Sequence, residues 1–201
     1  VPDVFGYVDF LRLPTLADKL RLFPDLARSF RIYENPLAIR YFSQTPYALV
    51  GHEAPLQVVK YMAVPVDPAE QAPIVLTPEQ MAARPPHYLR EVMAAHLASR
   101  AATFAFYVHQ APDSAAAMVD DATRLWRGGA MTKVATITIP VQDFRTPAQD
   151  DFAETISYSP WHCLHAHRPL GSVNLARRRV YREASALRHA NRAEPPTEPT
   201  N

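Results

Sequence analysis

The last quarter of the chain contains two residues whose types and spacing could support metal chemistry. Arg177 precedes Tyr181 by four positions in a segment predicted to be helical, and residues at i and i+4 share one face of a helix. A guanidinium beside a phenol favours the phenolate, because the opposite charge stabilises the ionised form. A phenolate is a hard anionic donor that can hold ferric haem iron. The pair therefore indicates a tyrosine-ligated haem.

Composition and charge restrict the other possibilities. The chain has 201 residues, of which 48% are hydrophobic and 20% charged, as is ordinary for one globular domain with a sizeable core. Its formal net charge of +1 gives no global electrostatic reason to expect nucleic-acid binding. The single cysteine, Cys163, excludes an internal disulfide and predicts a reducing, cytoplasmic compartment. No apolar run approaches the roughly 18 residues that cross a membrane, and the N-terminus shows no signal-peptide pattern.

Hydrophobic periodicity predicts an α+β chain. Helices are expected over 5–30, 87–101, 147–157 and 172–190, and strands over 57–64, 103–110 and 133–140. Thr146 before Pro147 has the pattern of an N-cap followed by a first-turn proline. The proline-rich stretch 65–86 predicts a long connector, and a domain over 1–192 is followed by a disordered tail over 193–201.

The number of strands bears on the architecture of the sheet. Long excursions separate the predicted strands, so a simple meander is not expected. Three or four strands are few for a closed barrel. The sequence therefore favours either an open sheet covered by helices or half of a larger barrel.

The segments around the Arg177–Tyr181 pair resemble a known family. Tyr158-Ser-Pro-Trp-His, His167-Arg-Pro-Leu-Gly and Arg177-Arg-Arg-Val-Tyr, read together, resemble the C-terminal haem-ligand region of catalase-like proteins. Residues 35–37, 41–47, 58–61 and 134–140 resemble the same proteins. The likeness is nearer to the divergent catalase-related branch, which includes allene oxide synthases, than to the large typical catalases.

The resemblance implies a cofactor, a fold and an activity. It implies haem b with its iron held by Tyr181, with Arg177 beside the phenolate and Tyr158 as a further haem contact. It implies antiparallel strands from part of a catalase-like β-barrel, covered by helices and followed by a C-terminal proximal haem helix. The activity implied is turnover of hydrogen peroxide or an organic hydroperoxide, with the chemistry supplied by the haem and tuned by the protein.

The chain also departs from the family. The family's distal histidine and asparagine precede the matched region, and none of the eight histidines here lies in a context that matches the distal one. We therefore expect the C-terminal portion of a catalase-like protein, with weak or absent activity in this chain alone. The alternative is a non-catalytic remnant without haem. A half barrel exposes unpaired strand edges, which favours association with a second copy or with an N-terminal partner half.

Two further interpretations concern clusters near the same region. The side chains of His162, Cys163, His165 and His167 are of the types that bind zinc, but their spacing matches no common zinc pattern. Arginines recur in the last helix and could contact phosphates, at positions 177, 178, 179, 182, 188 and 192. Stacking aromatics are not evident and Glu183 interrupts the run, so a solvated helix face is the simpler interpretation.

Overall fold

The computed structural model describes residues 31–51, 55–67, 71–112, 119–121 and 126–190. The helix predicted over 5–30 and the tail predicted over 193–201 lie outside these residues. In chain order the elements are η1 (Pro36–Ala38), β1 (Tyr41–Phe42), β2 (Tyr47–Leu49), β3 (Gln57–Pro65), α3 (Pro78–Ala82), α4 (Tyr88–Leu97), β4 (Ala102–Gln110), β5 (Met131–Ile139), α5 (Pro147–Thr155), η4 (His165–His167) and α6 (Ser172–Ala190). The predicted α+β class with antiparallel strands is confirmed.

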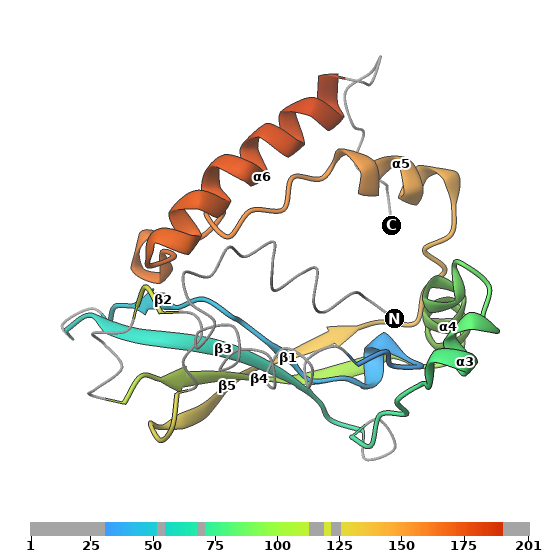
Figure 1. Ribbon diagram of the computed structural model, residues 1–201, viewed down its shortest axis with the longest axis horizontal. Coiled ribbons are helices and arrows are strands. Elements are labelled where there is room, and N and C mark those ends of the chain that lie inside the picture. The colour runs from blue at the N-terminus through green and yellow to red at the C-terminus, as the bar shows by residue number, and fades with distance from the viewer. Residues whose placement is uncertain (1–30, 52–54, 68–70, 113–118, 122–125, 191–201) are drawn as a thin grey trace, which may run out of the picture.

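The strands form one five-stranded antiparallel sheet (Figure 1). β3, β4 and β5 are neighbours in chain order, with Tyr61 opposite Val108 and Phe104 opposite Ile137. β1 and β2 both pair with the other edge of β3. The expectation that these strands would not form a simple meander is wrong. Loop-closure entropy rises only slowly with length, so a long excursion can still return its chain to the neighbouring edge.

A small apolar core holds α4 against the sheet. It consists of Leu37, Leu97, Ala102 and Phe104, all at most 5% exposed. Leu97 is the last residue of α4, and β4 begins a few residues later at Ala102. The end of the helix therefore packs against the strand that follows it. Ala102 and Phe104 are two residues apart in β4, so their side chains lie on the same face of the strand, toward this core.

The predicted connector over 65–86 contains a helix that was not expected. Thr77 caps α3 by accepting a hydrogen bond from the Gln80 backbone N–H, and the Gln80 side chain accepts one from the Thr77 N–H. This reciprocal capping box stabilises the start of α3. Pro78 does not disrupt the helix, because it lies in the first turn, where proline is tolerated. Thr146 caps α5 in a similar sequence context, as predicted.

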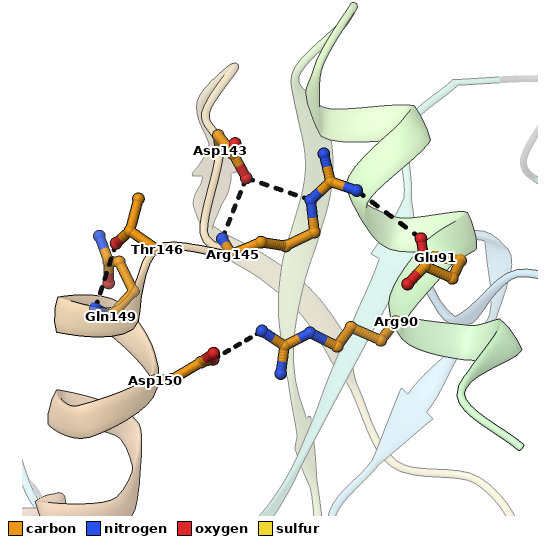
Figure 2. A network of polar contacts seen from close by, with 7 residues as sticks. All are labelled: Arg90, Glu91, Asp143, Arg145, Thr146, Gln149 and Asp150. Atoms are coloured by element: carbon orange, nitrogen blue, oxygen red, sulfur yellow. Dashed lines mark hydrogen bonds and ion pairs between the residues drawn. The ribbon is translucent and has the colours of Figure 1, made fainter.

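Ion pairs join α4 to the start of α5. Figure 2 shows Arg90 of α4 and Asp150 of α5 directed toward each other. Arg90 Nη2 lies 2.6 Å from Asp150 Oδ1. Arg145 pairs with two carboxylates: its Nη1 lies 3.6 Å from Glu91 Oε2, and its Nε lies 3.3 Å from Asp143 Oδ1. Exposed pairs of this kind contribute about 0–1 kcal/mol each, so the network orients α5 more than it stabilises the fold.

The last helix spans the distance from β2 to α5 (Figure 1). At its C-terminal end, His189 Nε2 donates to the Thr155 carbonyl oxygen at 2.6 Å and Arg188 donates to that of Ile156 at 3.0 Å. These two hydrogen bonds fix the C-terminal end of α6 to the end of α5. Within the described ranges, no helix is long and apolar enough to cross a membrane.

Candidate functional site

A glycine and an aspartate fix where α6 begins. Gly171 has a φ of +85°, a left-handed conformation that residues with a Cβ rarely adopt. A Cβ there would lie 2.7 Å from the backbone oxygen of Val119. The Asp120 carboxylate accepts a hydrogen bond from the Ser172 backbone N–H at 2.5 Å. Hydrogen bonds from Ser172 lower the pKa of Asp120, because they stabilise its ionised form.

One stripe of α6 faces the rest of the molecule, and this stripe is polar. Asn174 is fully buried, and Arg177, Tyr181 and Ser185 are half-buried, while the other residues of α6 are exposed. Spacings of three and four residues place these side chains one above another on a helix. The helix therefore presents polar side chains to the sheet instead of an apolar face.

Arg177 and Tyr181 meet as their spacing predicts. Arg177 Nη2 donates to the Tyr181 hydroxyl oxygen at 3.3 Å. The guanidinium carbon also lies 5.4 Å from the centroid of the Tyr181 ring, within the range of a cation–π contact. The phenol oxygen thus has a permanent cation as its hydrogen-bond donor, an arrangement that stabilises negative charge on that oxygen.

Arg177 is held on its other side by Thr45 and Asn174. Its Nη1 donates to the Thr45 hydroxyl oxygen at 3.1 Å and to Asn174 Oδ1 at 3.2 Å. Burial lowers the pKa of the Arg177 guanidinium, but the hydrogen bond to Tyr181 and the phenol groups of Tyr181 and Tyr47 outweigh it and raise the pKa overall. Arg177 is consequently a fixed positive charge.

A pocket of about 350 Å³ opens beside the pair. Its lining combines α6 with the connection between β1 and β2, through Phe42, Ser43, Gln44, Thr45, Tyr47, Val173, Arg177 and Tyr181. Ser43 fixes that connection to β3, because its Oγ accepts from the Tyr61 N–H at 2.8 Å and its N–H donates to the Tyr61 carbonyl at 2.9 Å. The volume is near the lower end of the range for small-molecule sites.

Aromatic rings continue from the pocket across the sheet. Tyr47 lies 4.9 Å from Tyr61 between ring centroids, and Tyr61 stacks on Phe106 at 5.5 Å. Burial raises the pKa of Tyr61, and nearby Tyr47 and Cys163 raise it further. The rings therefore form a rigid wall of neutral aromatic groups behind Tyr47.

The loop before α6 docks on β2 and positions the helix. The Ala48 N–H donates to the Arg168 carbonyl at 2.8 Å, and the Leu170 N–H donates to the Pro46 carbonyl at 3.0 Å. Trp161 adds a second attachment, because its Nε1 donates to the Asn174 carbonyl at 3.1 Å and Arg178 lies 4.7 Å over its ring. The residues around Trp161 and Leu170 therefore attach the loop to β2 and to α6.

The remaining predicted site residues lie elsewhere. Tyr158 is 68% exposed and is not among the residues that line the pocket, so its role as a haem contact stays a prediction. No group of three or more potential metal ligands occurs in the part of the chain that the structure describes, which includes His162–His167. Several arginines of α6 have partners: Arg178 stacks on Trp161, and Arg182 pairs with Glu183 at 3.1 Å.

Sequence reasoning missed the two side chains that hold Arg177, which are those of Asn174 and Thr45. Asn174 precedes Arg177 by three positions, so the helical period alone indicated a shared face. Thr45 gave no such signal, because it is 129 positions away from the Asn174 side chain to which it bonds. Only the pairing of β2 with β3 and the docking of the loop on β2 bring these residues together.

The fold is similar to that of catalases of known structure. A fungal catalase matches with a TM-score of 0.65 and 17% sequence identity, over 78% of this chain and 32% of that chain. Catalase A from Saccharomyces cerevisiae matches with a TM-score of 0.72 and 18% identity, over 90% of this chain and 38% of that chain. The fold is therefore catalase-like, and the chain spans about a third of the length of these catalases. No protein-family model and no curated protein matches the sequence.

Proposed function

We propose that this chain forms the proximal side of a haem b site in a catalase-related protein. In this proposal α6 is the proximal helix, Tyr181 is the iron ligand and Arg177 is its hydrogen-bond partner. The strands β1–β5 form part of a catalase-like barrel. The substrate class is hydrogen peroxide or an organic hydroperoxide.

The observation that carries the proposal is the hydrogen bond from Arg177 to the Tyr181 hydroxyl oxygen beside the pocket. A tyrosine that only covers the surface does not require a guanidinium donor whose own position is fixed by two further side chains. Here Thr45 and Asn174 direct Arg177 toward the phenol. A phenol oxygen that faces a fixed cation is suited to carry negative charge, and a phenolate is the iron ligand of catalase.

The residues around the pocket fit a ferric haem. The phenol oxygen supplies a hard anionic ligand, and the eight lining residues include no carboxylate that would compete for the iron or repel the propionates. Phe42 and Tyr47 provide aromatic surface of the kind that lies against a flat macrocycle. When bound, the haem supplies cleavage of the peroxide O–O bond. Tyr181 would hold the iron, and Arg177 would donate a hydrogen bond to the ligand oxygen and keep it oriented.

The pocket itself offers no group to move the proton of a peroxide. Its eight lining residues include no histidine, and proton transfer by a positioned side chain contributes about 10²–10⁴-fold in rate. We therefore propose that this chain alone turns over peroxide weakly or not at all, even with haem bound. Full activity would need an acid–base group on the opposite face of the haem.

A hemin titration of the purified chain tests the proposal. We expect stoichiometric binding with a ferric absorbance spectrum, and loss of that spectrum in Tyr181→Phe. Tyr107→Phe is the matched control, because Tyr107 lies in β4 and does not line the pocket. Identical spectra and affinities for the parent chain and Tyr181→Phe would refute the assignment. With hemin bound, comparison of hydrogen peroxide with an organic hydroperoxide would distinguish the two substrate classes.

The exposure of β5 supports a second candidate function, in which the chain is a non-catalytic module that associates through this strand. Eight of its nine residues are exposed, and Met131, Val134 and Ile137 are 42–54% exposed. Among the described strands, β5 pairs only with β4. A long apolar edge strand of this kind favours pairing with another chain.

Light scattering tests this second candidate. We expect a dimer that Ile137→Lys dissociates and that Val66→Lys leaves intact, because Val66 is similarly exposed but lies outside β5. A monomer over the whole concentration range would exclude self-association through β5. A dimer that binds no hemin would favour this candidate over the haem protein.

A further inference from the structure

Asn174 is the most completely buried polar side chain of the site, with no exposed surface. Every polar atom of its amide is used. Nδ2 donates to the carbonyl oxygens of Pro46 at 2.9 Å and Leu170 at 2.7 Å. Oδ1 accepts from the Thr45 hydroxyl at 3.0 Å and from Arg177 Nη1 at 3.2 Å. A buried amide with four satisfied hydrogen bonds has a single orientation.

The two carbonyls decide which way the amide points. A carbonyl oxygen can only accept, so Pro46 and Leu170 must face the Nδ2 group, and Oδ1 must then face Arg177. A flipped amide would oppose oxygen to oxygen on one side and N–H to N–H on the other. The backbone of two separate segments therefore fixes the acceptor that meets the guanidinium.

The Thr45 hydroxyl completes this arrangement. It receives a hydrogen bond from Arg177 Nη1, so its own proton is available for Asn174 Oδ1. Nη1 is thus held by two acceptors, which fixes the rotation of the planar guanidinium about its bond to the side chain. The rigid fork of the guanidinium then directs Nη2 at the Tyr181 hydroxyl oxygen.

We propose that Asn174, assisted by Thr45, is a positioning residue that fixes the Arg177 guanidinium so that it donates to the Tyr181 oxygen. This inference rests on the proposed function for its role toward haem, but the fixed guanidinium is a property of the chain itself. Pro46 precedes β2, and Leu170 lies in the loop before α6 that docks on β2. Because the Asn174 amide bonds to the carbonyls of both residues, the position of Arg177 beside Tyr181 depends on the docking of that loop. Partners that orient a metal ligand typically change metal affinity by about 10–100-fold.

The first test uses the chain without haem. Arginine-selective NMR of the full chain should show slow rotation and separate Nη1 and Nη2 signals for Arg177, assigned by their loss in Arg177→Lys. Asn174→Leu should merge these signals, and Thr45→Val should do so partly. Arg178, stacked on Trp161, is the internal control and should not change. Unchanged Arg177 signals in both variants would overturn the proposal.

The second test is a hemin titration arranged as a double-mutant cycle. Asn174→Leu should weaken hemin binding about 10–100-fold in the parent chain and should not change the weak residual hemin affinity of Tyr181→Phe, because both changes remove the same interaction. Equal losses in both backgrounds would mean that Asn174 acts only on general stability. Asn35→Ala, which removes an asparagine side-chain hydrogen bond outside the pocket, at the start of η1, should leave hemin affinity unchanged.

The two tests separate failure of the inference from failure of the proposed function. A parent chain that does not bind hemin would refute the proposed function, while the NMR result would still decide whether Asn174 fixes Arg177. If Asn174→Leu does not fold, as judged by circular dichroism, Thr45→Val decides the question. That variant removes one of the two acceptors that hold Arg177 Nη1 and the hydrogen bond from Thr45 to Asn174 Oδ1, so mobile Arg177 signals in it would support the inference and unchanged signals would contradict it.

Discussion

Substitution of Gly171 by alanine should destabilise the fold through two separate costs. A residue with a Cβ loses about 1–2 kcal/mol in the left-handed conformation that Gly171 adopts at φ +85°. The new Cβ would also lie 2.7 Å from the Val119 backbone oxygen and 3.2 Å from Asp120 Oδ1. A backbone oxygen cannot move aside by rotation, so overpacking adds about 1–3 kcal/mol. The expected total loss is about 2–5 kcal/mol.

Gly128→Ala is the matched control for this prediction. Gly128 also has a φ of +85°, but a Cβ there would meet nothing within 4 Å. Urea unfolding should therefore show a loss of about 1–2 kcal/mol for Gly128→Ala and a larger loss for Gly171→Ala. Because Gly171 sets the start of α6, hemin affinity should fall only in Gly171→Ala. Equal losses of stability in the two variants would refute the close contact between Gly171 and the 119–121 segment.

Three further predictions concern the elements that support the site. Because the pKa of Asp120 is lowered in the folded chain, its carboxylate stabilises the fold above the pKa it has in the unfolded chain, and this stabilisation is lost as pH falls through the folded-state pKa. The parent chain should therefore lose more stability than Asp120→Asn below about pH 4. Parallel profiles of stability against pH for the two proteins would contradict this. Leu97→Ala should cost about 2–5 kcal/mol in urea unfolding, because Leu97 is 2% exposed within the core, and a loss below 1 kcal/mol would mean that α4 packs loosely. Trp161→Phe removes the Nε1 hydrogen bond to Asn174 but keeps a ring under Arg178, so it should cost about 0.5–1.5 kcal/mol and less than Trp161→Ala in the same assay.

The long elements could be predicted from sequence because their patterns are local. α6 begins and ends at the predicted residues, and β3, β4 and β5 each lie within two residues of the predicted strands. β1 and β2 have only two and three residues, and they exist as strands because β3 offers them an edge. α3 was missed because proline dominates its surroundings, although the Thr77–Gln80 capping pattern was present in the sequence.

The candidate site likewise combines a local contact, which the sequence predicts, with contacts between distant segments, which it does not. The contact between Arg177 and Tyr181 follows from a spacing of four residues on one helix, and it could be read without a structure. The contacts that fix Arg177 depend on Thr45 and on the carbonyl of Pro46, which reach α6 only through the sheet and the docked loop. Tertiary contacts between distant segments leave no periodic signal in a single sequence, so this part of the site required the structure.

Resonance Raman spectroscopy of the hemin-bound chain tests the central claim most directly. Excitation in the phenolate-to-iron charge-transfer band enhances ring vibrations of a tyrosine only when its oxygen is bound to the ferric iron. The proposed ligation predicts enhanced tyrosinate bands in the parent chain and in Tyr107→Phe, and their loss in Tyr181→Phe. Hemin binding without tyrosinate bands, or bands that persist in Tyr181→Phe, would contradict the assignment of Tyr181 as the haem ligand.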